Sequence, residues 1–178
     1  MLLTQRPIRS YRRGSLSVEL LLVVVVLAIV TVGIVQFGVF FADADVVALA
    51  ARVGAEEASQ TANLPTVPGP VPANIISAIQ HQLQSSQIDW SHIRLEHNVT
   101  PGDAPVDLNS DSGGGYDVSP KTDLASPPSP GTHYVRLTVT VPLAELFPRA
   151  LSFFGEQLFT NNKSYEHTAV FRYELATP

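Results

Sequence analysis

The longest apolar pattern in the chain runs from Leu20 to Phe41, where 22 residues carry no charge and only Thr31 and Gln36 are polar. About 20 residues of this kind, folded as a helix, span the roughly 30 Å hydrocarbon core of a bilayer. The pattern therefore predicts a transmembrane helix.

The pattern beyond Phe41 predicts that the same helix continues outward. Residues 42–60 are rich in alanine and place apolar side chains at helical spacing, so we expect one helix over 15–62, half in lipid and half packed against a domain. A solvated alanine-rich stalk is the alternative. Four prolines in 63–72 break helical geometry, and that stretch has the composition of a linker.

The remaining periodic segments predict an α+β domain over 73–178. Residues 73–84 carry one apolar stripe and predict a second, short helix. Polar and apolar residues alternate at about 93–99, 135–141 and 165–174, which predicts three strands of a small antiparallel sheet packed on the long helix. Residues 143–154 indicate an amphipathic helix or turn.

A long interval between the first two of these strands has no periodic pattern. Residues 101–131 are rich in Pro, Gly, Ser and Asp and include Gly113, Gly114 and Gly115. Such a composition does not supply a packed core, so we expect a long disordered loop at the surface.

Length and charge indicate how many domains the chain can form and which side of a membrane each part faces. The 178 residues are 45% apolar, enough for one modest domain and an anchor. All four basic residues of the leader 1–14 are arginines without an acid among them, whereas the rest of the chain has seven bases and 16 acids. The positive-inside bias predicts a cytoplasmic leader and an exported C-terminal domain. With no cysteine, disulfides and thiolate metal sites are excluded.

Two ordinary export signals fit the N-terminus less well. Ala48-Leu49-Ala50 could end a cleaved signal peptide, but such peptides have apolar regions of about 7 to 15 residues, far shorter than this one. Tyr11 to Gly14 has the paired arginines of a twin-arginine signal, yet Ser15 and Ser17 stand where apolar residues are expected.

A specific motif lies at the membrane edge. Gly14 stands five residues before Glu19, the lone carboxylate beside the apolar run. A carboxylate at the centre of a membrane helix costs about 2.5 to 3.5 kcal/mol, and somewhat less near an interface, so it usually has a cationic partner. In a plain signal anchor, by contrast, Glu19 would simply be solvated among the headgroups.

This motif resembles the class III signal of type IV pilins and pseudopilins, in which a prepilin peptidase cuts after the glycine. The resemblance implies cleavage between Gly14 and Ser15, and pairing of Glu19 with the new ammonium of a neighbouring subunit, which sets the register of an assembly. Ser15 and the valine- and leucine-rich helix are more similar to TadE-like proteins of tight-adherence (Flp) pilus systems than to pilins that begin with phenylalanine. The C-terminal Ala169–Glu174 is also similar to that family.

The resemblance implies a structural, non-enzymatic minor pilin or pseudopilin in the inner membrane, used in assembling a pilus for adhesion and surface attachment. Its expected partners are the prepilin peptidase, other pilin subunits, the inner-membrane assembly platform and the lipid bilayer. No cofactor, metal or nucleic acid is expected. The alternatives are an uncleaved signal anchor that displays a binding module, and an anchored exported hydrolase.

The sequence gives weaker support for a metal site or a catalytic site. Asp107, Asn109 and Asp111 alternate as in a calcium loop, but Ser112 and Val118 replace the glycine and glutamate of that motif. The five histidines include a pair on a predicted strand, at positions 92 and 97, an odd number apart and so on opposite faces. We expect these histidines to be solvated at the surface. No catalytic signature is present.

Overall fold

The computed structural model describes residues 12–89, 91–98, 105–112, 133–146 and 163–173. By its contacts the chain divides into two units, residues 1–38 and residues 39–178. Each unit is described by itself.

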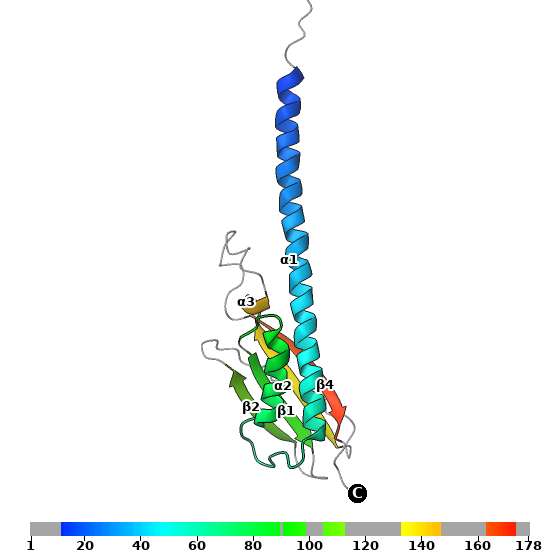
Figure 1. Cartoon of the computed structure of the whole chain (residues 1–178), viewed down its shortest axis with the longest axis vertical. Helices are drawn as coiled ribbons and strands as arrows, with labels where there is room; N and C mark the ends of the chain where they lie inside the picture. The colour runs from blue at the N-terminus through cyan, green and yellow to red at the C-terminus, as the bar shows by residue number, and fades with distance from the viewer. Residues whose placement is uncertain (1–11, 90, 99–104, 113–132, 147–162, 174–178) are drawn as a thin grey trace, which may run out of the picture. The chain divides into compact units, whose positions relative to one another are not determined.

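The first helix, α1 (Arg12–Gln60), is 49 residues long and supplies the described part of the first unit and the start of the second (Figure 1). The apolar residues in its N-terminal half do not pack on a protein core. Their side chains are exposed, for example Leu20 by 67% and Ile34 by 68%. Beyond Gly38 the helix acquires a buried face of small residues, formed by Ala44, Val47, Ala50, Ala51, Gly54, Ala55 and Ala58.

The second helix, α2 (Ala73–Gln84), has the bounds that its apolar stripe predicted. It follows Pro72, whose fixed φ suits the entry to a helix and whose carbonyl accepts bonds from Ile75 and Ile76. Ile75, Ile79 and Leu83 are its buried residues.

The strands form one antiparallel sheet in the order β2-β1-β3-β4. Its members are β1 (Ser91–Asn98), β2 (Val106–Ser112), β3 (Tyr134–Pro142) and β4 (Ser164–Arg172). The long apolar helix, the short helix and the small antiparallel sheet confirm the α+β class.

The expectation of three strands and an unbroken loop over 101–131 was wrong at β2. This strand pairs with β1 along its length, Leu95 opposite Leu108 and His97 opposite Val106. Among residues 106–110, whose burial the structure describes, only Leu108 is fully buried, so the backbone ladder to β1, and not an apolar pattern, defines the strand. The rest of that interval, 101–104 and 113–131, lies outside the described residues.

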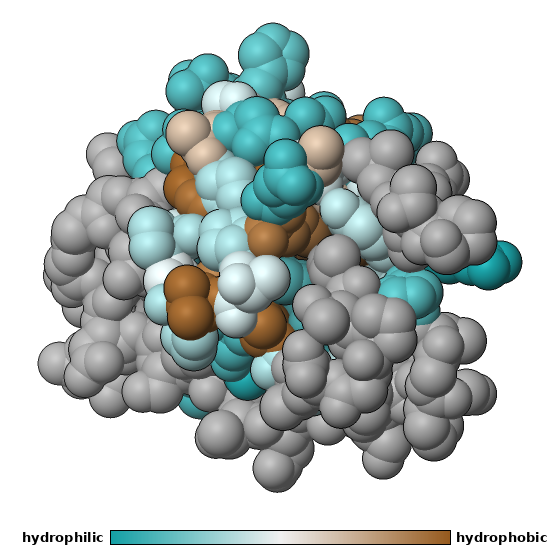
Figure 2. Space-filling view, turned by 90° about the horizontal axis from the view of Figure 1, so that it is seen from below, coloured by the Kyte–Doolittle hydropathy of each residue, from teal (hydrophilic) through white to brown (hydrophobic). Residues whose placement is uncertain are grey.

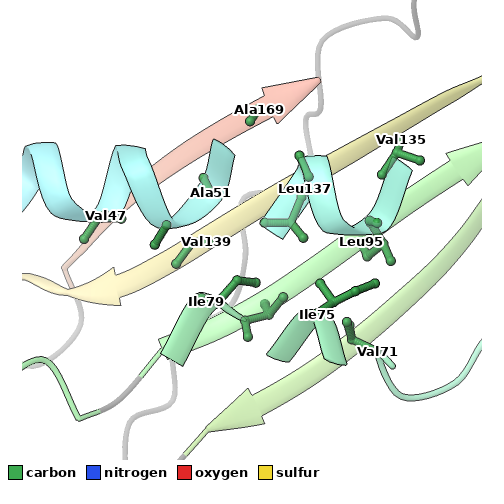
Figure 3. Close-up of a cluster of buried hydrophobic side chains, with 14 of the residues drawn as sticks. Val47, Ala51, Val71, Ile75, Ile79, Leu95, Val135, Leu137, Val139 and Ala169 are labelled. Carbon is green, nitrogen blue, oxygen red and sulfur yellow. The ribbon is translucent and has the colours of Figure 1, made fainter. Parts of the chain in front are cut away.

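The core of the second unit lies between the helices and one face of the sheet (Figure 3). Val47 and Ala51 from α1 and Ile79 from α2 point toward Leu137 and Val139 of β3. An added Cβ at Gly54 would lie 2.6 Å from Ile79 Cγ1 and 3.2 Å from Leu137 Cδ1. Glycine at this position therefore lets α1 approach α2 and the sheet closely.

The proline-rich segment 63–72 is packed along the sheet edge at β2. Gly69 forms a parallel bridge with Leu108, its carbonyl accepts a bond from the Asn109 amide at 3.0 Å, and the Val71 amide donates to Ser110 Oγ at 2.9 Å. Leu64 and Val71 are buried. The segment thus belongs to the domain despite its linker-like composition.

The expected helix or turn at 143–154 is seen only at its start. A short helix, α3 (Leu143–Leu146), follows β3 directly and buries Leu146 in the core. Residues 147–154 lie outside the described residues.

Candidate membrane anchor and assembly site

The described residues contain one helix long and apolar enough to cross a membrane, the segment Ser17–Gln60 of α1. Its most hydrophobic part is not buried inside the protein, and the large apolar side chains from Val18 to Val39 that the structure describes there are exposed. On the face shown in Figure 2, by contrast, hydrophilic residues cover most of the described surface and hydrophobic ones form small areas. The exposed apolar surface is concentrated on the helix.

The predicted processing residues lie at the start of this helix. Since α1 begins at Arg12, Gly14 and Ser15 fall in its first turn. Glu19 is exposed and follows Ser15 by four residues, about 6 Å along the axis and on the same helical face. A carboxylate so placed can meet a cation from a neighbouring molecule.

The two polar residues within the apolar segment, Thr31 and Gln36, differ in their hydrogen bonding. The Thr31 hydroxyl donates to the Leu27 carbonyl at 2.8 Å, which satisfies it within the helix. Gln36 is only 5% exposed, and its Nε2 has no hydrogen-bond partner among the described residues.

The calcium-loop candidates lie on a strand. Asp107, Asn109 and Asp111 occupy alternate positions of β2, and the backbone there is extended and paired with β1. The Asp107 carboxylate is held by Arg94, with Nη2 to Oδ2 at 2.7 Å and Nε to Oδ2 at 2.9 Å. Within the described ranges no group of three or more His, Asp or Glu residues could hold a metal ion.

The histidine pair lies on opposite faces of β1 as predicted, but the expectation of solvated histidines was wrong for His97. Its ring is 1% exposed and faces the core with Ile93 and Leu95, while His92 is half-buried on the other face. His97 Nε2 lies 3.0 Å from the Pro65 carbonyl. The alternation of apolar and polar residues along β1 already placed His97 on the same face as Ile93 and Leu95.

The face of the sheet away from the helices carries a buried polar group that the sequence analysis missed. Glu96 lies opposite Arg136 with 3.5 Å between Oε2 and Nη1, and accepts a hydrogen bond from the Tyr134 hydroxyl. Burial, together with the hydrogen bond and charge of Glu96, raises the pKa of Tyr134 to about 12. The alternating charges were visible in the sequence, whereas the register that joins them was not.

No family model, curated protein or solved structure matches this chain.

Proposed function

We propose that this chain is a structural, non-enzymatic subunit of the TadE-like class, a pseudopilin or minor pilin of a tight-adherence pilus. One observation carries the proposal: Gly14 stands five residues before Glu19, at the start of a 49-residue helix whose residues from Leu20 to Phe41 are uncharged. In this proposal α1 anchors the subunit in the inner membrane, with the leader in the cytoplasm and the second unit on the outer side.

Processing would change the charge at the membrane edge. The leader arginines favour a cytoplasmic N-terminus during insertion. Cleavage after Gly14 removes all four of them and leaves an ammonium on Ser15. That ammonium is then the nearest cation for a neighbouring subunit's Glu19, which gains a partner for a carboxylate that is otherwise costly in lipid.

The other end of the chain supports the same assignment. The C-terminal residues that resemble the family begin in β4 and reach Tyr173, whose hydroxyl donates to the Thr61 carbonyl at 3.0 Å just beyond α1. The Tyr173 amide also bonds to the His133 carbonyl at 3.1 Å. These two hydrogen bonds of Tyr173 link the sheet to the residue that follows α1.

Intact mass of the membrane-extracted chain, expressed with and without a cognate prepilin peptidase, tests the processing step. We expect loss of residues 1–14 only with active peptidase, and at least a ten-fold drop in processed product for Gly14→Val. Gly33→Val is the matched control, because nothing lies within 4 Å of an added Cβ at that glycine. A mature chain in the native host that keeps its leader would instead support the uncleaved anchor with a binding module.

The same cells test the role of Glu19. Glu19→Ala should insert and be processed as the wild type is, while its recovery in sheared pilus or assembly fractions falls several-fold because the subunit loses its register partner. Assembly at the wild-type level would show that Glu19 is only an interfacial residue.

A further inference from the structure

The outer edges of β2 and β4 differ. Along β2 the segment 63–72 covers the edge, since Gly69 bridges Leu108 and its carbonyl accepts a bond from the Asn109 amide. Along β4, no strand other than β3 pairs in the described part of the chain. Proteins commonly protect an edge with a proline, a lysine or a bulge. Residues 164–172 contain no proline or lysine and pair with β3 in an unbroken register, so this edge is suited to accept a further strand.

Backbone groups of alternate β4 residues point to this open edge. The Tyr173 amide donates to the His133 carbonyl, and the Leu143 amide donates to the Lys163 carbonyl. In an antiparallel ladder, residues that exchange bonds with one neighbouring strand alternate with residues that do not. The odd-numbered residues of β4 therefore direct their N–H and C=O groups to β3, and the even-numbered residues direct theirs to the open edge.

The side chains of the even-numbered residues share one face of the sheet and carry both apolar surface and charge. Val170 is 49% exposed, and Thr168 and Arg172 are also exposed. Arg172 forms no ion pair in the described part of the chain. Glu166 lies six residues before it, about 20 Å along the strand, which is too far for a pair within one copy. A strand that runs in the opposite direction would bring an acid to this base.

We propose that β4 pairs with β4 of a second copy of this chain, antiparallel and centred on Ala169. The twofold axis then sets Arg172 of each copy opposite Glu166 of the other. It also sets Thr168 opposite Val170. Each of these residues exchanges both backbone hydrogen bonds with the residue opposite it. The two four-stranded sheets become one continuous sheet.

Backbone and side chains together select this register. A centre on a residue, and not between two residues, is needed to set even-numbered residues opposite even-numbered ones. A centre on Thr168 lengthens the ladder but places Val170 opposite Glu166, an apolar side chain against a carboxylate. Centres farther toward either end of β4 remove Arg172 or Glu166 from the paired residues. The centre on Ala169 is therefore the one that places each base opposite an acid.

The pairing fixes the relative direction of the two copies. In the second unit, α1 runs along the sheet in about the same direction as β4 (Figure 3). An antiparallel pair reverses that direction in the second copy, whereas neighbours anchored in one bilayer by the same end have parallel helices. The contact therefore joins copies from different membranes or filaments. It goes beyond the proposed function and does not depend on processing of the leader.

Disulfide trapping tests the register, because the chain has no cysteine of its own. Full-length Thr168→Cys and Val170→Cys chains with different tags are purified separately in detergent, mixed and oxidised. The proposed register places the two positions about 5.5 Å apart between Cα atoms, within the limit of about 7 Å for a disulfide. We expect the mixed product to exceed either matched product at least ten-fold. Thr168→Cys with Ser77→Cys, an exposed residue of α2, measures random collision.

Mixed cross-linking at the collision level, or stronger cross-linking of a matched pair, overturns the register. Vesicles test the direction. The two variants in separate vesicle populations should cross-link when the populations are mixed at high concentration. The same variants placed together in one population, diluted so that vesicles seldom meet, should cross-link only at the collision level. A strong product in the diluted vesicles would show a contact within one membrane and overturn the proposed direction.

A proline variant separates the pairing from the fold. Because the Thr168 amide points to the open edge, Thr168→Pro removes a donor from the proposed contact and none from the ladder to β3. Ala169→Pro, the matched control, removes a donor to β3 and should lower the thermal midpoint. We expect Thr168→Pro to keep the wild-type thermal midpoint and to sediment as a monomer at concentrations where the wild type in detergent is a dimer.

A folded Thr168→Pro chain that dimerises as the wild type does, or a wild type that stays monomeric at every concentration, overturns the proposal. If Thr168→Pro does not fold, Arg172→Glu makes the same measurement at an exposed side chain. That variant places two acids opposite each other and should weaken dimerisation at least ten-fold. Unchanged dimerisation of a folded Arg172→Glu chain would equally overturn the pairing.

Discussion

His97 shows how a single residue joins two distant segments of this protein. If its Nε2–H donates to the Pro65 carbonyl, Nδ1 carries the lone pair, and Nδ1 is buried without a hydrogen-bond partner among the described residues. Protonation would place a charged N–H at that position with no acceptor. Burial therefore lowers the pKa of His97, although the bond to Pro65 acts in the opposite direction.

This lowered pKa predicts a pH-dependent stability. The unfolded chain binds a proton at His97 near pH 6.5 and the folded chain only at lower pH, so the free energy of unfolding falls as the pH drops below about 6.5, by at most about 1.4 kcal/mol per pH unit. Urea unfolding between pH 8 and pH 5 measures this loss. His97→Gln keeps an N–H donor without titrating and should show a smaller slope.

The matched control for that series is His81→Gln, since His81 is exposed on α2. Its unfolding free energy should follow the wild-type pH dependence. If His97→Gln also keeps the wild-type slope, the pH dependence comes from other groups and the account of His97 is wrong.

At the scale of secondary structure, the sequence predicted the elements whose apolar residues recur at a regular interval, such as α2 and β3. It did not predict β2, which is defined by its backbone pairing with β1. The stripe of Ile75, Ile79 and Leu83 defined α2, and strict alternation defined β3. In β2, Leu108 is the one fully buried residue among 106–110, where burial is described, and the strand is defined by its pairing with β1. The candidate processing and assembly residues could be predicted because their signal is a local spacing, whereas the contact of Glu96 with Arg136 and Tyr134 depends on the register between β1 and β3.

The close approach of α1 to α2 at Gly54 gives a prediction at this scale. Gly54→Ala would gain up to about 1 kcal/mol of helix propensity, but its Cβ would lie 2.6 Å and 2.7 Å from Cγ1 and Cδ1 of the fully buried Ile79. Overpacking costs about 1 to 3 kcal/mol, so we expect a net loss of up to about 2 kcal/mol, measured by denaturant unfolding.

A double-mutant cycle tests the cause of that loss. Ile79→Ala alone should cost about 2 to 5 kcal/mol by leaving a cavity. Together with Gly54→Ala it should cost less than the sum, because the new methyl group occupies part of that cavity. Additive costs would show that the two positions do not compete for the same space.

On the scale of the whole molecule, the two units differ in whether their apolar side chains are buried or exposed. In the described residues, every member of the buried hydrophobic cluster lies in the second unit, from Val47 onward. The first unit contributes apolar side chains that are exposed, such as Leu22 by 61% and Phe37 by 61%. Among the described residues, the core of the second unit is therefore formed without residues 1–38, whose helix is long and apolar enough to cross a membrane.

This division predicts that residues 39–178 fold without the anchor. The fragment should be recovered without detergent and show one cooperative thermal transition by circular dichroism, because no cluster residue has been removed. Leu137→Ala, at a fully buried position of β3, is the control and should lower its stability by about 2 to 5 kcal/mol. A fragment that aggregates or melts without a transition, and regains both properties when residues 1–38 are restored in detergent, would show that the membrane segment also supports the domain.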